Sequence, residues 1–233
     1  VAYTDPRGFL VRGASHRRGD QSEDISGRLS LLFEPSDAFT ANVKGFMSRK
    51  RGEPVPRQMW RCYGANGRPQ PQLGQSNASE DCTINKTYTQ YSAPEIWLPT
   101  WPDAGDGTQR LDVDTELLIG NMTYDTGPVS INSITAYYNS RATQFLDSGS
   151  GTLYGFEPQN YRAFSQEFRV ATDLGGAFDA VLGGYFQDTR LAHQLANRFS
   201  PSQADPATGR YYSLDKQSRI NGKTRSAFIE GIL

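Results

Sequence analysis

Residues 25–49 have the sequence ISGRLSLLFEPSDAFTANVKGFMSR, and their pattern is that of two strands joined by a tight turn. From Ile25 to Phe33 every second residue is apolar or Gly, with one exception at Leu32. The alternation returns from Phe39 to Met47. A period of two indicates strands with one apolar face. Pro35–Asp37 favours a tight turn, because Pro presets φ and Asp can bond its own backbone.

The same alternation returns along the chain and predicts an all-β, antiparallel, up-and-down sheet. Further strands are expected from about 111 to the turn at 125–128, over 129–145, 161–172 and 177–194, and from about 224 onward. Tight turns at 35–37, 125–128 and 173–176 alternate with longer connections at 50–109, 146–160 and 195–222. Short turns at one end and long loops at the other are typical of outer-membrane barrels. Strands of about 9–11 residues suit a tilted membrane crossing.

The composition agrees with a barrel that is wet on one side. Apolar residues make up 36% of the 233 residues, below the roughly 45–50% of an ordinary globular domain. A barrel strand needs only one apolar face. No run of about 18 apolar residues occurs, which argues against a membrane-spanning helix. The net charge of −1 provides no basic field for nucleic acid.

The sequence contains no signature of catalysis. A nucleophile elbow, a phosphate-binding loop, an HExxH pair and paired CxxC motifs are all missing. We therefore expect a protein that is not an enzyme and that holds no cofactor or metal. Acidic residues at 103, 106, 112 and 114 supply oxygen atoms of the kind that Ca²⁺ prefers, but their spacing is not that of an EF-hand loop.

The long segment at about 50–109 is the first candidate for ligand contact, because loops carry function more often than the scaffold does. Aromatic rings suited to stacking on a sugar or a chelate are Trp60, Tyr63, Trp97 and Trp101. Arg57 and Arg61 are the cations expected to attract an anionic ligand. Two alternatives remain open: the rings form a small core of the loop itself, and the arginines are ordinary solvated charges.

Two cysteines, Cys62 and Cys82, lie within that loop. An even number of cysteines in one loop predicts a disulfide in an oxidising compartment. Closing a loop of this length stabilises the chain by roughly 3 kcal/mol in the chain-entropy model. The alternative is a pair of free thiols.

Charged residues within the predicted strands are expected to face a water-filled lumen, because a dry core would penalise them. This expectation covers Asp112, Asp114, Glu116, Glu167 and Arg169. They either line a transport path or form salt bridges between strands, and the second interpretation is the simpler one.

Several segments resemble those of the TonB-dependent receptor family. The strand-turn-strand from Gly27 to Phe39 is similar to a recurrent element of the family. The hairpin formed by Phe164–Thr172 and Val181–Phe186 resembles another. Weaker similarities occur at Ser133–Tyr137 and Ser226–Gly231.

The resemblance implies about eight strands of a larger transmembrane barrel in the bacterial outer membrane, with residues 1–233 as a partial barrel domain. It also implies active uptake of a ferric siderophore or similar large nutrient, energised by the TonB complex through a plug domain. No plug or TonB-binding segment is found, and both ends resemble interrupted strands, so we expect a fragment. Two alternatives stay open: a passive porin-like barrel, and a soluble secreted β-sandwich that binds carbohydrate.

Overall fold

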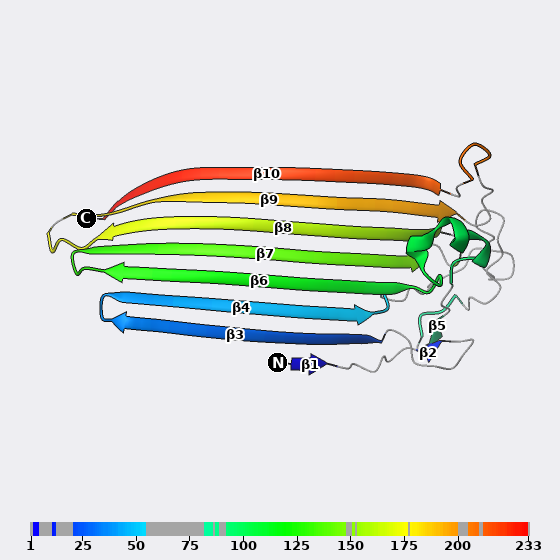
Figure 1. Cartoon of the computed structure of the whole chain (residues 1–233), viewed down its shortest axis with the longest axis horizontal. Helices are drawn as coiled ribbons and strands as arrows, with labels where there is room; N and C mark the ends of the chain where they lie inside the picture. The colour runs from blue at the N-terminus through cyan, green and yellow to red at the C-terminus, as the bar shows by residue number, and fades with distance from the viewer. Residues whose placement is uncertain are drawn as a thin grey trace.

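The computed structural model describes residues 2–4, 11–12, 21–54, 82–85, 87–88, 92–147, 151, 153–176, 178–199, 205–209 and 212–232. Within them the fold is one antiparallel sheet of eight strands in the order β1-β3-β4-β6-β7-β8-β9-β10 (Figure 1). Apart from the short β1, each strand pairs with the next long strand of the sequence. The predicted up-and-down β topology is confirmed.

Seven of these strands are long and run side by side. They are β3 (Ser22–Ser36), β4 (Phe39–Gly52), β6 (Arg110–Asp125), β7 (Val129–Asp147), β8 (Leu153–Thr172), β9 (Asp179–Phe199) and β10 (Tyr212–Ile232). Their lengths of 14 to 21 residues exceed the 9–11 residues that a membrane crossing requires. A strand of this length is therefore longer than one membrane crossing needs.

Three short elements complete the sheet and the long loop. Strand β1 (Ala2–Thr4) pairs with β3, and β2 (Val11–Arg12) pairs with β5 (Thr87–Tyr88) in a separate two-stranded sheet. Two 3₁₀ helices, η2 (Glu95–Thr100) and η3 (Pro102–Ala104), precede β6. Among the described residues, no helix is both long enough and apolar enough to cross a membrane.

The connections differ at the two ends of the sheet (Figure 1). The β3–β4, β6–β7 and β8–β9 turns lie together at one end and are short. The strand ends joined by the longer connections, which are those of β4 and β6, β7 and β8, and β9 and β10, lie at the other end. At the β6–β7 turn, Gly127 has φ +90°, and its N–H donates to Asp125 Oδ1 at 2.7 Å. The predicted asymmetry of turns and loops is confirmed.

Two predicted loop boundaries are wrong. The segment 146–160 was expected to be a medium loop, but strand β8 already begins at Leu153. The segment 195–222 was expected to be a long loop, but β9 continues to Phe199 and β10 begins at Tyr212. These strand ends lack a continuous apolar face, because Gly155 and Pro158 interrupt the start of β8 and Tyr212, Leu214 and Ile220 are the only large apolar residues between positions 212 and 222. Without an apolar face, a strand has no period-two signal in its sequence.

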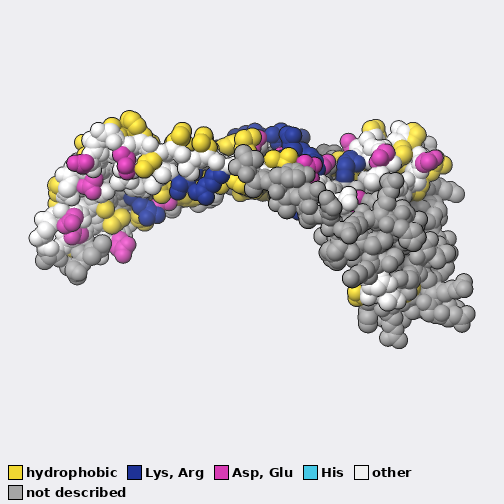
Figure 2. Space-filling model, turned by 90° about the horizontal axis from the view of Figure 1, so that it is seen from below, with side chains coloured by type: hydrophobic (Ala, Val, Ile, Leu, Met, Phe, Trp, Pro, Cys, Tyr) yellow, Lys and Arg dark blue, Asp and Glu magenta, His cyan; other side chains and the backbone are white. Residues whose placement is uncertain are grey.

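The sheet is arched (Figure 2). Hydrophobic side chains gather along its convex side, over the half that ends in the tight turns. Among the described residues, the buried hydrophobic cluster lies at the opposite, loop end of the sheet. A soluble sandwich would instead bury one face of its sheet along the whole strand length.

Candidate functional site

The register of the strands places most exposed apolar side chains on one face, which we call the outer face. A directly paired residue lies on the same face as its partner, and alternate residues lie on the opposite face. The apolar band of the outer face contains Leu29, Leu31, Phe33, Val43, Met47, Leu118, Met122, Tyr124, Tyr137, Phe164, Phe168, Leu182 and Ile229, all more than a third exposed. An exposed apolar surface of this extent marks a site of contact with lipid or protein.

The inner face has the opposite character. Its rows carry mainly small and polar side chains, among them Ser26, Asn42, Ser48, Thr115, Asn121, Ser140, Ser165, Gln187, Ser218 and Thr224. The Asn132 amide donates to Asn121 Oδ1 at 2.8 Å and to Thr123 Oγ1 at 3.0 Å. Such a surface suits a water-filled interior.

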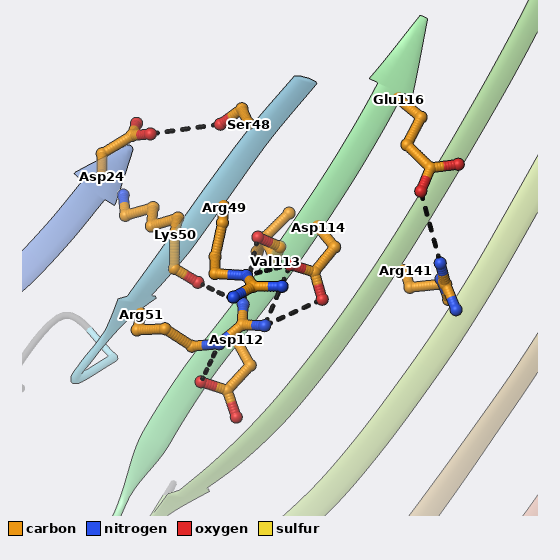
Figure 3. Close-up of polar contacts among 10 residues, drawn as sticks. All are labelled: Asp24, Ser48, Arg49, Lys50, Arg51, Asp112, Val113, Asp114, Glu116 and Arg141. Atoms are coloured by element: carbon orange, nitrogen blue, oxygen red, sulfur yellow. Dashed lines mark hydrogen bonds and ion pairs between the residues drawn. The ribbon is translucent and has the colours of Figure 1, made fainter. Parts of the chain in front are cut away.

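Toward the loop end, the outer face changes from apolar to charged. Arg51 Nη2 donates to both carboxylate oxygens of Asp114, at 2.9 and 2.8 Å, and Arg49 Nε reaches Asp114 at 3.3 Å (Figure 3). Arg51 also lies 3.6 Å from Asp112. Glu116 accepts from Asn139 at 3.1 Å and from Arg141 at 3.5 Å. These residues form a charged belt next to the apolar band.

The predicted lumen-facing position of Asp112, Asp114 and Glu116 is therefore wrong. They share the outer face with Leu118 and Met122 of the same strand, whereas Glu167 and Arg169 lie on the inner face and bond each other. Period two shows which residues share a face, but not which face is convex. Strand β6 has 16 residues and is longer than the apolar band. Its outer face is therefore apolar near the turn and charged beyond the band.

The boundary between the band and the belt crosses the sheet diagonally. Ser133, Thr135 and Gln166 are polar residues inside the band. Toward the loops, the last apolar residues of the outer face before the belt are Ile25, Met47, Leu118, Tyr137, Phe164, Phe186 and Ala227 on successive long strands. Ile25 pairs directly with Arg49, whereas Ala227 lies in the row that leads through Gly184 and Phe168 to Ala41. From β3 to β10 the boundary thus shifts by eight residues toward the end of the sheet that carries the tight turns. The shift never reverses from one strand to the next.

This diagonal measures the tilt of the strands against a flat boundary. Eight residues correspond to about 27 Å along a strand, and six strand spacings to about 29 Å across the sheet. The ratio gives a tilt of about 43°, within the 35–45° of transmembrane barrels. On β4 the band runs from Phe39 to Met47, or about 20 Å along the normal of that boundary at this tilt. With the side chains at both ends, its height approaches the ≈ 25 Å apolar band of such barrels.

One polar cluster interrupts the band and is satisfied internally. Gln166 Oε1 accepts from Thr135 Oγ1 at 2.6 Å, and Gln166 Nε2 donates to Ser133 Oγ at 2.9 Å. All three lie on the outer face. Polar groups in hydrocarbon are tolerated when they bond one another, so the cluster is compatible with a lipid environment.

At the loop end, η2 and η3 are anchored to the outer face by an aromatic cluster. Trp97 packs edge-on against Tyr154 at 5.7 Å between ring centroids, and Trp101 packs edge-on against Phe145 at 5.3 Å. Trp97 is 2% and Trp101 0% exposed. Tyr154 Oη donates to Ser92 O at 2.7 Å, which ties the segment before η2 to β8.

A buried arginine completes the anchor. Arg198 of β9 is 0% exposed, and its guanidinium lies 4.3 Å from the ring centroid of Trp101. Its Nη1 donates to Trp97 O at 3.3 Å and to Thr100 Oγ1 at 3.1 Å, and its Nη2 donates to Thr100 O at 2.7 Å. The sequence does not predict this role, because Arg198 lies in the segment 195–222, which was expected to be a loop.

Gly107 is required where the anchored segment closes on itself. It has φ +81°, and a Cβ at this position would lie 3.1 Å from Ala93 O. The Ala93 N–H donates to Gly107 O at 3.0 Å. The left-handed backbone and the close approach both favour glycine. The base of the long loop therefore has a defined conformation from residue 92 to β6.

The structure separates the candidate ligand residues into two groups. Trp97 and Trp101 are buried in the anchor, which is the packing role weighed as the alternative to ligand contact. Trp60, Tyr63, Arg57 and Arg61 lie outside the described residues. Their contact with a ligand stays a prediction.

The acidic residues considered for calcium do not form a site. Within the described part of the chain, no three His, Cys, Asp or Glu side chains gather as metal ligands. Asp112 and Asp114 are engaged by arginines. Asp106 accepts from the Thr108 N–H at 2.9 Å, and this backbone hydrogen bond holds the pKa of the Asp106 carboxyl below its ordinary value.

Cys82 is not a free thiol, whereas Cys62 lies outside the described residues, so their pairing stays a prediction. We expect no reactive thiol when the protein is denatured without reductant and treated with a thiol reagent, and two after reduction. Finding two reactive thiols before reduction would contradict the pairing. A Cys62→Ser, Cys82→Ser double variant is the blank for the measurement.

Comparisons with known proteins support the fold. No protein-family model and no curated protein matches the sequence. The chain is similar to the crystal structure of the ferric yersiniabactin uptake receptor FyuA from Yersinia pestis, with a TM-score of 0.60 and 14% identity, over 98% of this chain and 38% of that one. It is also similar to the ferric citrate transporter FecA in the unliganded form, with a TM-score of 0.51 and 11% identity, over 95% of this chain and 29% of that one.

The resemblance to TonB-dependent receptors is thus confirmed at the level of the fold. The chain has the architecture of a segment of the barrel wall of these transport proteins. It spans well under half the length of either one. The activity, ligand and partners of such a receptor therefore remain proposals for this chain.

Proposed function

We propose that this chain forms part of the wall of a bacterial outer-membrane receptor that takes up a large, scarce nutrient with energy from the TonB system. The observation that carries the proposal is the match of nearly the whole chain to the fold of a ferric yersiniabactin uptake receptor. The apolar band, with its diagonal boundary, supports a location in a membrane. One of the two structural neighbours is a ferric yersiniabactin uptake receptor and the other is a ferric citrate transporter. Both names favour a ferric chelate as the ligand of this chain.

The long loop between β4 and β6 is the part that we propose to contact the ligand. Trp60 and Tyr63 supply rings for stacking, and Arg57 and Arg61 supply charge for an anionic chelate. Trp97 and Trp101 contribute by fixing the base of this loop on the outer face. No catalytic role is proposed for any residue. The proposed partners are the TonB complex, reached through a plug, and outer-membrane lipid.

Uptake of iron tests the proposal. The protein at its full encoded length is expressed in a Gram-negative host that lacks its own ferric-chelate receptors, and a panel of ⁵⁵Fe-loaded siderophores and ferric citrate is supplied. We expect accumulation of at least one chelate in a host with TonB and none in an isogenic host without TonB. Absence of both uptake and chelate binding across the panel would argue against a ferric ligand.

A passive porin-like barrel is the second candidate, favoured by the polar inner face. It predicts diffusion of small hydrophilic solutes that does not depend on TonB. It also predicts steady ion conductance when the purified protein is added to a planar bilayer. Steady conductance together with TonB-independent uptake would favour the porin hypothesis over the receptor hypothesis.

A further inference from the structure

We propose that the outer face binds a phosphorylated lipid of the outer leaflet, with Arg162 and Arg190 holding a phosphate of its headgroup. The proposal rests on the membrane location proposed above. The headgroup chemistry that fits is that of bisphosphorylated lipid A.

Arg162 of β8 and Arg190 of β9 are directly opposite each other on the outer face. Side chains in this relation have Cβ atoms about 4.5–5.5 Å apart, and two like charges there destabilise the sheet. The unfavourable pair becomes favourable when an anion lies between the two guanidinium groups. Arginine suits this task, because its planar fork binds phosphate in a bidentate manner.

The charges around the pair sum to an excess of cations. Asp188 is the one carboxylate of the depression that these residues line, and it lies 3.5 Å from Arg190 Nε, whose side chain remains 62% exposed. Lys223 is opposite Asp188, and Arg225 lies over the Phe186 ring at 5.9 Å. Glu116, two strands away, is bonded to Asn139 and Arg141.

Within the described ranges, Arg162, Lys223 and Arg225 form no ion pair with a carboxylate. Four cations therefore share one acid here. By contrast, the arginines of β4 meet Asp112 and Asp114 (Figure 3). The unbalanced charge is confined to the part of the belt over β8–β10.

Aromatic rings form the floor below these cations. Arg162, Arg190, Asp188, Tyr137, Phe164 and Phe186 line one surface depression of about 240 Å³. The Phe164 and Phe186 centroids are 6.4 Å apart. Phe164 and Phe186 are the last apolar residues of the band on their strands, and Arg162 and Asp188 come next toward the loops. Such rings lie at the level of the headgroups in membrane proteins.

This vertical order matches an amphiphile rather than a free anion. A lipid that stands on the outer face would place its phosphate at the arginines and the first carbons of its acyl chains on the rings. A soluble phosphate would bind the cations but would make no contact with the aromatic rings. The depression opens on the outer face, away from the polar interior, so the uptake route does not explain its charges.

The test is a lipid titration of the full-length protein in detergent, followed by native mass spectrometry. Three proteins are compared: wild type, Arg162→Gln/Arg190→Gln, and a control, Arg28→Gln/Lys44→Gln, which removes two charges from the inner face. Hexa-acylated bisphosphorylated lipid A is the probe, and its dephosphorylated form is the second probe. Each basic residue at an anionic lipid surface contributes about fivefold in affinity, so we expect the outer-face double variant to bind roughly thirtyfold more weakly.

Wild type and control should bind the phosphorylated lipid equally well, and the dephosphorylated lipid should not distinguish the three proteins. Equal affinity of wild type and the outer-face variant for the phosphorylated lipid overturns the proposal. So does equal affinity of the wild type for the two lipids, a comparison that needs no variant. The folding of the wild type is checked by gel electrophoresis with and without heating, since a folded membrane barrel migrates differently before it is boiled. No such difference would contradict the membrane location itself. A folded barrel that binds lipid A without dependence on its phosphates would contradict this site alone.

Discussion

Replacing Val43 by arginine is expected to destabilise the folded protein in lipid by roughly 2–4 kcal/mol, the cost of a cation near the middle of the hydrocarbon on the lipid face of a barrel. On β4 the apolar band runs from Phe39 to Met47, and Val43, 41% exposed, lies at its centre. The neighbouring Asn42 points to the inner face. Asn42→Arg should therefore cost about 1 kcal/mol or less, as surface substitutions usually do.

The measurement is urea-induced unfolding from lipid vesicles, with tryptophan fluorescence as the signal. Both variants place the same residue at adjacent positions of one strand, so the comparison depends mainly on the face that each position occupies. Equal destabilisation by the two substitutions would show that Val43 does not face lipid. Greater destabilisation by Asn42→Arg would reverse the assignment of the two faces.

Replacing Arg198 by alanine is expected to release the segment that contains η2 and η3 from the sheet. The substitution removes charge-assisted hydrogen bonds to Trp97 O, Thr100 O and Thr100 Oγ1 and the contact with the Trp101 ring. Hydrogen bonds from a charged donor contribute about 1.5–3 kcal/mol each, and the acceptors would remain buried without their partner. We expect a local destabilisation of about 3 kcal/mol or more.

Hydrogen exchange resolves this effect, since it reports local opening separately from global unfolding. Protection of the amides of residues 97, 101 and 104, which donate within the 3₁₀ helices, should fall by about a hundredfold or more, because each 1.4 kcal/mol is a factor of ten. Amides in the centres of β7 and β8 should keep their protection. Arg219→Ala, an exposed arginine of β10, is the control. Unchanged protection in the Arg198 variant would mean that the aromatic packing alone holds the segment.

The sequence predicted the hairpins of this fold because the half of each strand near the tight turns has one apolar face. In that half, period two is strong, and the turns carry Pro, Gly and Asp. Beyond the band, apolar residues are fewer and do not alternate regularly, and the extensions 153–160 and 212–222 were therefore assigned to loops. These extensions are strands because their backbone pairs with β9. Gln159 of β8 and Ser218 of β10 both pair with His193, from opposite sides.

Part of the candidate site required the register between strands. The alternation predicted that Asp112, Asp114 and Glu116 share a face. Only the pairing with β4 shows that Arg51 and Arg49 lie opposite the two aspartates. The diagonal boundary likewise appears only when residues on seven strands are aligned. The role of Arg198 depends on a segment about a hundred residues earlier in the chain, so no local pattern predicts it.

The central claim is that a flat membrane boundary crosses the tilted strands, and one pair of residues tests it most directly. Met47 and Asn221 belong to one row of paired residues that runs through Glu116, Asn139, Arg162 and Arg190. A nitroxide is attached to a cysteine at either position, with Cys62 and Cys82 replaced by serine, and its collisions with oxygen and with a water-soluble nickel chelate are compared in lipid vesicles. The claim predicts that the label at Met47 collides mainly with oxygen, as in hydrocarbon, and the label at Asn221 mainly with the chelate. The same environment at both positions would contradict a membrane that cuts the sheet along this diagonal.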